Sequence, residues 1–143
     1  TPEELLASPA NTLAMDASEI EERREVMEGF FRAWSKGMYV GEVNPEAAEA
    51  MLRQAVPEEW ENEAAGKGLF DGVLPMNIST TKQLGDLQTD VWTNVQPRML
   101  SSGAIKEEVD VSTFLNDTYI DAANDFDRAE VEAEAAEWVT ANQ

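Results

Sequence analysis

Apolar side chains recur every three or four residues in several stretches of the chain, and this spacing predicts helices. In the clearest stretch, residues 18–38, the apolar positions fall on one helical face and charged residues occupy the opposite face. The apolar positions of this stretch are Ile20, Met27, Phe30, Phe31, Trp34 and Met38. Ser18 followed by Glu21 has the spacing of a capping box, which predicts a helix beginning near Ser18.

A second helix is predicted to begin at Asn44 and Pro45. An asparagine side chain accepts hydrogen bonds from the free N–H groups of the first turn, and proline has no N–H to leave unpaired there. Gly29 inside the first helix costs about 1 kcal/mol relative to alanine, which suggests close packing against a neighbour. Gly37 and Gly41 are expected to loosen or end a turn.

The next stretch predicts only a short acidic helix, over residues 58–65. We expect this helix not to continue further, because it is followed by residues that break helices: Gly66, Gly68, Gly72 and Pro75.

A third helix of about 20 residues is predicted to begin at residues 79–81, where a serine or threonine caps it. We expect it to be kinked at Pro97 and to stop at Gly103. Its apolar positions are Leu84, Leu87, Val91, Trp92, Val95, Met99 and Leu100.

The remaining elements are shorter. A fourth helix is predicted with the apolar positions Phe114, Leu115, Ile120 and Ala123. Asp127 and Glu130 form a second capping box, which begins a last helix with Val131, Ala135, Trp138 and Val139 on its apolar face. Residues 2–6 are expected to form one helical turn, and residues 11–15 a short strand. The predicted fold class is therefore mainly α, with five or six helices and one or two short strands.

The order of these features resembles the C-terminal part of periplasmic solute-binding proteins of ABC importers, of the sulfonate and thiamine-precursor class. The capped aromatic helix ending in FRAWSKGM is followed by NPEAA, GVLPMNIS, a helix with Trp92, and then GAI, VD and FLNDTYIDAANDFD. The similarity spans about residues 11–138. Its motifs consist of helix caps and apolar helical positions.

The resemblance implies a fold and a function. Residues 1–143 would be a single partial domain, helices that buttress one lobe of a two-lobed α/β protein of the type 2 periplasmic binding fold. The full-length protein would capture a small organic solute in the periplasm and present it to the ABC permease. This function is transport and not catalysis. Because the family's cleft residues come from earlier segments, no binding residue is carried over to this chain.

Two expectations about partners follow. Helices that normally cover a sheet would expose apolar surface to water if the sheet is missing, at a free-energy cost of about 25 cal/mol per Å². A homodimer that covers this surface is therefore predicted if this chain is a truncated part. The alternative is a self-standing acidic helical module that binds a partner protein through an apolar groove. That alternative predicts an exposed contiguous patch formed by Phe30, Trp34 and Met38.

Charge excludes several classes of partner. The chain has 29 acidic and 10 basic residues and a formal net charge of -19. Such a surface repels nucleic-acid phosphates and anionic lipid headgroups, so neither is expected as a partner. A solvated surface is the favoured interpretation of the acidity, with a cation or basic partner as the alternative.

Candidate chemistry is sparse. Without histidine or cysteine there is no histidine base, thiolate nucleophile or zinc site of the usual ligands, and we predict no catalytic residue, metal or cofactor. Residues 121–132 place acidic residues at four positions of a twelve-residue calcium-binding loop of the EF-hand type. Phe126 stands where that loop requires a glycine. A helix ending near Asn124 and another capped by Asp127 explain the same residues.

The four tryptophans complete the candidate residues. Trp34, Trp92 and Trp138 lie on apolar helical faces, which favours packing in the core. Trp60 lies between Glu59 and Glu61, and it is the tryptophan that we expect to meet a ligand or partner.

Overall fold

The computed structural model describes residue 9 and residues 12–142. These residues form helices and loops without any strand, which confirms the mainly-α class. The α-helices are α2 (Glu19–Glu22), α3 (Arg24–Val43), α4 (Pro45–Ala55), α5 (Glu63–Asn77), α6 (Thr89–Ser101), α7 (Ile120–Ala123) and α8 (Arg128–Ala141). Two short 3₁₀ helices are η1 (Pro57–Trp60) and η2 (Val111–Thr113).

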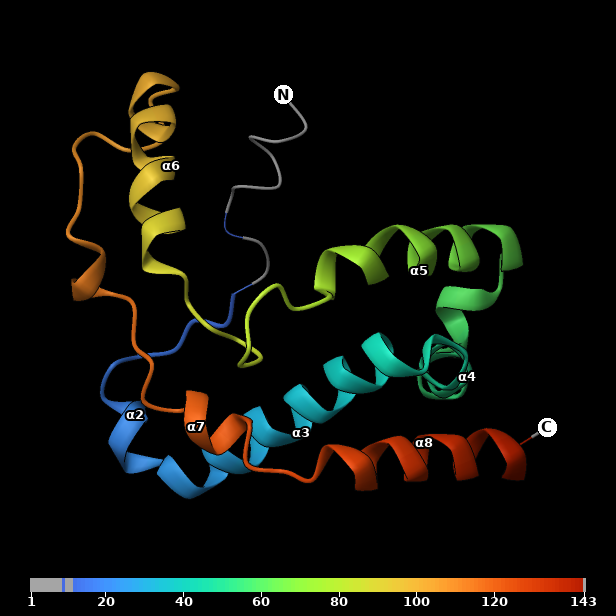
Figure 1. Ribbon diagram of the computed structural model, residues 1–143. Coiled ribbons are helices and arrows are strands. Elements are labelled where there is room, and N and C mark those ends of the chain that lie inside the picture. Colours follow the sequence, from blue (N-terminus) through green and yellow to red (C-terminus); the bar gives the residue numbers. More distant parts are fainter. Residues whose placement is uncertain (1–8, 10–11, 143) are drawn as a thin grey trace.

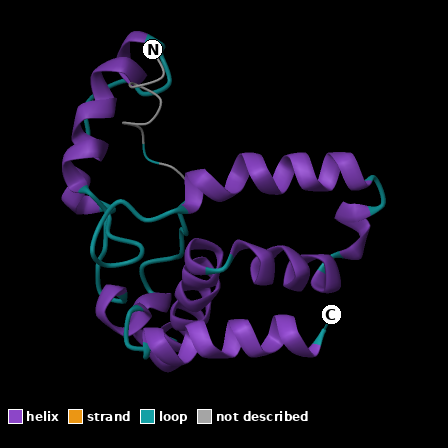
Figure 2. Ribbon diagram, turned by 45° about the vertical axis from the view of Figure 1, so that its right-hand side comes forward, coloured by secondary structure: helices purple, strands orange, loops and turns teal. Residues whose placement is uncertain are grey.

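Helix α3 is the centre of the arrangement (Figure 1). Helices α4, α7 and α8 pack against it, and α8 also packs against α4. Helix α5 lies on the side of α3 and α4 that faces away from α8, and η1 connects it to α4 (Figures 1 and 2). Helix α6 stands apart from this group and packs chiefly against η2.

Local sequence signals explain the helices around α3. The Asn44 side chain accepts a hydrogen bond from the Ala47 N–H (3.1 Å) at the start of α4, with Pro45 in the first turn. Asp127 accepts from the Ala129 N–H (2.9 Å) and from the Glu130 N–H at the start of α8. Both predicted helix starts are confirmed.

The core is small and lies between α3, α7 and α8. Tyr39, Leu84 and Val131 form its buried cluster, and Val40 and Phe126 pack against them. The Tyr39 hydroxyl donates to the Glu132 carboxylate (2.5 Å), which ties α3 to α8. This bond, together with removal of the ring from water, raises the pKa of Tyr39.

The loop before α6 is fixed to α7. The Leu84 N–H donates to the Asn124 side-chain oxygen (2.9 Å), and the Asn124 side-chain N–H donates to the Leu84 carbonyl (3.0 Å). Gly85 and Gln88 follow with positive φ angles of 82° and 43°, which interrupt any helix. The predicted start of the third helix at residues 79–81 is therefore wrong, and α6 begins at Thr89.

Four other expectations are also wrong. A helix begins beside Ser18, at Glu19, but the Ser18 hydroxyl and N–H both bond to the Asp16 carboxylate (2.6 and 2.9 Å), so the side chain does not cap it. The helix is also interrupted at Arg23, between α2 and α3. Gly29 has open space around its Cα and no close neighbour. Gly37 and Gly41 lie inside α3 instead of loosening or ending a turn.

The shorter elements differ as well. The predicted fourth helix is reduced to the single turn of α7, because Asp110 caps η2 and residues 114–119 form an irregular loop with turns at its two ends. Residues 12–15 form no strand, and residue 11 lies outside the described residues, as does the helical turn expected at residues 2–6. Helix α6 ends at Ser101 beside Gly103, whose φ angle of 75° confirms the predicted stop.

Replacement of Leu84 by alanine is expected to lower the free energy of unfolding by about 2–3 kcal/mol, because it removes apolar contacts from a core that has few. Urea denaturation followed by far-UV circular dichroism measures the change. Leu13→Ala is the control, since Leu13 is half exposed and its replacement should change the value by no more than about 0.5 kcal/mol. Equal effects of the two replacements would mean that Leu84 is not part of the core.

Candidate functional site

An open apolar cleft lies between α3, α4, η1 and α5. Its volume is about 620 Å³. Among the described residues that line it, only Glu42, Glu59 and Asn77 carry polar side chains. The main apolar side chains are Trp34 and Met38 from α3, Met51 and Leu52 from α4, and Leu69 and Val73 from α5.

The apolar side chains that form the walls of this cleft are unusually exposed to water. Leu69 is 56% exposed and Trp34 is 49% exposed. Phe30 lies next to Trp34, with their ring centroids 6.0 Å apart, and extends the apolar surface along α3. An apolar patch that continues over several elements is typical of a binding surface.

Glycine positions shape the cleft. At Gly41 of α3, a Cβ atom would lie 3.2 Å from the Leu74 side chain, so a small residue lets α3 and α5 approach there. At Gly66 of α5, a Cβ atom would lie 2.8 Å from both the Glu59 carbonyl oxygen and the Trp60 ring. The first turn of α5 therefore rests directly on the Trp60 ring.

Trp60 lines the cleft and contacts both helices that flank η1. The Arg53 guanidinium of α4 lies over its ring, 3.9 Å from the centroid. Phe70 of α5 lies beside it, with ring centroids 6.3 Å apart. The structure thus places the residue expected from the sequence at the cleft, and its role in binding stays a prediction.

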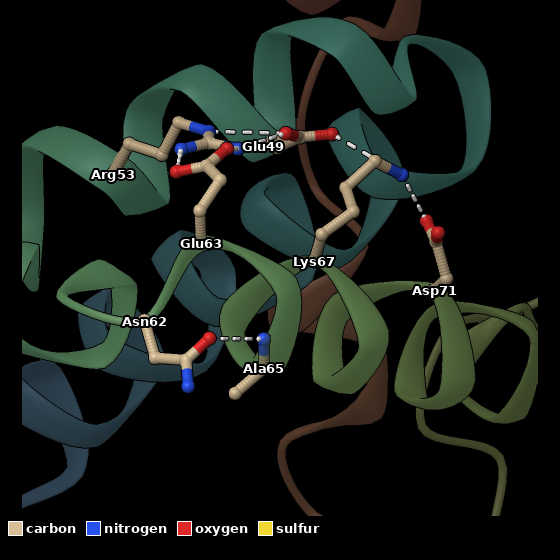
Figure 3. A network of polar contacts seen from close by, with 7 residues as sticks. All are labelled: Glu49, Arg53, Asn62, Glu63, Ala65, Lys67 and Asp71. Carbon is tan, nitrogen blue, oxygen red and sulfur yellow. Dashed lines mark hydrogen bonds and ion pairs between the residues drawn. The ribbon is translucent and has the colours of Figure 1, made fainter.

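A network of ion pairs joins α4 to α5 (Figure 3). Arg53 of α4 donates to Glu49 (3.0 Å) on its own helix and to Glu63 (2.8 Å) of α5. Lys67 of α5 pairs with Glu49 (3.6 Å) and with Asp71. The hydrogen bonds from Arg53 hold the pKa of Glu63 below its usual range.

Helix α5 is the part of the site that the sequence reasoning missed. A helix over residues 58–65 was expected to end at Gly66 and not to continue past Gly68, Gly72 and Pro75, yet α5 runs through all four of these residues. The sequence did contain a signal, because Asn62, a residue type that caps helices, stands just before this helix. In the structure its side chain accepts a hydrogen bond from the Ala65 N–H (3.1 Å). The apolar positions that follow at helical spacing are Leu69, Phe70, Val73 and Leu74.

The other tryptophans lie in different surroundings. Trp34 was expected in the core, and its exposure in the cleft shows that expectation to be wrong. Trp92 packs edge-on against Phe114, with ring centroids 5.6 Å apart. Trp138 is partly buried.

The acidic side chains in residues 121–132 form helix caps, hydrogen bonds and ion pairs within the fold. Helix α7 ends at Ala123 and Asp127 caps α8, so the predicted helix boundary is confirmed. Asp121 accepts a hydrogen bond from Gln83 (2.9 Å), and Asp125 pairs with Arg32 (3.6 Å). Over the described ranges, no group of three or more acidic side chains is arranged to hold a metal ion.

Comparisons of the chain with protein families, curated proteins and solved structures give no match. No helix in the described part of the chain is both long enough and apolar enough to cross a membrane.

Two glycine replacements in α5 test the contact between Gly66 and the Trp60 ring. Gly66→Ala is expected to destabilise the fold and shift the tryptophan emission, because the new Cβ would overlap the Glu59 backbone and the indole. Gly68→Ala is the matched control, since its Cβ meets open space and alanine favours a helix by up to about 1 kcal/mol. Thermal unfolding and fluorescence spectra measure both, and equal behaviour of the two variants would contradict the contact.

The ion pairs between α4 and α5 predict a pH dependence. The pKa of Glu63 is lowered in the folded state, so its contribution to stability is present above the unfolded pKa of about 4.3 and is lost as pH falls further. Native chain and Glu63→Gln are compared by thermal unfolding. We expect the native chain to melt higher at neutral pH, and the difference to shrink as pH falls below the unfolded pKa and to vanish once pH lies below the lowered folded-state pKa of Glu63. A difference that persists in acid would contradict this assignment.

Proposed function

We propose that this chain is a non-enzymatic binding module whose cleft takes an amphipathic helix of a partner protein. The open apolar cleft between α3, α4 and α5 is the observation that carries the proposal. Its walls are themselves helices, and grooves between helices accept the apolar face of another helix through side chains spaced at three, four and seven residues. The exposure of Phe30 and Trp34 along α3 supports the same conclusion.

The composition of the cleft favours a helix over a small polar solute. Its volume of about 620 Å³ falls within the range of small-molecule pockets, roughly 300–1,000 Å³. Such pockets orient their ligands through several convergent polar groups, whereas the charged side chains lining this one are Glu42 and Glu59. Two carboxylates disfavour an anion such as a sulfonate, and apolar walls suit an apolar helix face.

A second candidate is that the chain forms part of a larger periplasmic solute-binding protein of an ABC importer. The accessible surface of 10044 Å² supports it, because a compact monomer of 15.8 kDa exposes about 7,300 Å². A surplus of roughly 1,000 Å² remains even when the eleven residues outside the description are counted as fully exposed. In this candidate the full-length protein binds the solute and contacts the permease, and this chain alone forms a homodimer.

A neutral dye tests whether the cleft is open. Nile red, which the chain's negative charge does not repel, should bind the native chain with a blue-shifted and saturable emission. Leu69→Glu should reduce that signal at least several-fold, because it places a charge in the apolar wall. Val26→Glu is the matched control, since Val26 is 59% exposed on α3 and lies outside the cleft.

Two results would count against the module. Equal dye binding by the two variants would show that the signal comes from elsewhere. Sedimentation equilibrium separates the two candidates, because a module is monomeric without its partner. A dimer whose dye uptake falls as protein concentration rises would support the second candidate.

A further inference from the structure

The charges around the cleft are strongly one-sided. The stretch from residue 33 to residue 78, which supplies all the lining side chains, carries eight carboxylates and three cations. The carboxylates are Glu42, Glu46, Glu49, Glu58, Glu59, Glu61, Glu63 and Asp71, and the cations are Lys36, Arg53 and Lys67.

Two of these three cations, Arg53 and Lys67, are already engaged in ion pairs. Arg53 bonds to Glu49 and Glu63, and Lys67 pairs with Glu49 and Asp71. The other five carboxylates of the stretch form no ion pair with any residue that the structure describes, and all five are exposed. They are Glu42, Glu46, Glu58, Glu59 and Glu61.

Two of these unpaired carboxylates, Glu42 of α3 and Glu59 of η1, line the cleft itself. Both are exposed in the open cleft, and carboxylates without cations beside them attract a partner of opposite charge. An apolar helix face bound in the cleft would exclude water and strengthen that attraction. Lysine and arginine complement this arrangement, because their methylene stems pack along apolar surface while their charged ends reach a carboxylate.

We infer that the occupant of the cleft is a cationic amphipathic helix, with lysine or arginine flanking its apolar face. This inference rests on the proposed function and names the chemistry of its partner. Helix α5, which forms one wall, has 15 residues, and a partner segment of similar length would span about 22 Å. Met38 and Met51 in the walls have flexible side chains that adapt to different apolar residues, so the site selects by charge more than by sequence.

The same charges argue against other occupants. A second copy of the chain would bring a net charge of -19 to a cleft that already holds unpaired carboxylates. Like charges at an interface are unfavourable, and they slow the encounter of the two molecules. Phosphate-bearing surfaces are repelled for the same reason.

Three stapled helical peptides of 15 residues with one shared apolar face test the inference. Their flanking positions are lysine and arginine, glutamine, or glutamate, and each is titrated into the native chain by fluorescence anisotropy in low and high salt. The cationic peptide should bind at least tenfold more tightly than the neutral one in 50 mM salt. That ratio should shrink several-fold in 500 mM salt, because salt screens the attraction.

Variants assign the effect to the cleft. The double replacement Glu42→Gln and Glu59→Gln should weaken the cationic peptide several-fold and leave the neutral peptide unchanged. Glu107→Gln with Glu108→Gln is the matched control, since it removes the same charge from exposed positions outside the cleft. Leu69→Glu should weaken the neutral peptide as well.

The outcomes separate the two proposals. Equal affinity for cationic and neutral peptides would overturn the inference and leave the proposed function standing. An equal effect of the two double replacements would also overturn it, because the attraction would then come from net charge alone. Failure of all three peptides to bind, or a dimer that covers the cleft, would overturn the inference and the proposed function together.

Discussion

The contact between Trp60 and Gly66 determines where α5 lies, and the cleft depends on it. The indole is held from one side by Arg53 of α4, and the first turn of α5 rests on it where a glycine provides room. Ion pairs from Glu63 and Lys67 then tie α5 to α4 along its first turns. Beyond them α5 approaches α3 at Gly41 and Leu74, and an apolar cleft stays open between these supports.

The open cleft also explains why the core is small. Buried apolar side chains gather on the opposite side of α3, around Tyr39, Leu84 and Val131. Leu69, Val73 and Met76 of α5 remain exposed to water. Exposed apolar surface costs about 25 cal/mol per Å², and a bound helix would recover part of this free energy. In the proposed module, the surrounding carboxylates would disfavour association of the chain with its own copies, because like charges repel.

The sequence predicts those parts of the fold whose causes are local. Helices α3 and α4 follow from apolar periodicity, and α8 follows from the Asp127 cap and its helix-favouring alanine and glutamate residues. Asn44 marks the start of α4. The start of α6 could not be predicted, because the preceding loop is held by Asn124, forty residues away in sequence. The α3 wall of the cleft, with Trp34 and Met38, belongs to the patch that the alternative hypothesis predicted. The α5 wall escaped prediction because glycines in α5 indicate a break, although Gly66 is needed for packing. Trp60 could be singled out, since its charged neighbours made it the least core-like of the four tryptophans.

The central claim is that the cleft is open to solvent in the folded chain, and methyl NMR with a neutral paramagnetic co-solute tests it most directly. Leu84 is 5% exposed and provides the buried reference, whereas Leu52 and Leu69 lie in the cleft walls and are 43% and 56% exposed. The structure predicts that the methyl signals of Leu52 and Leu69 broaden strongly while those of Leu84 persist. Protection of all three leucines to the same degree would contradict an open cleft.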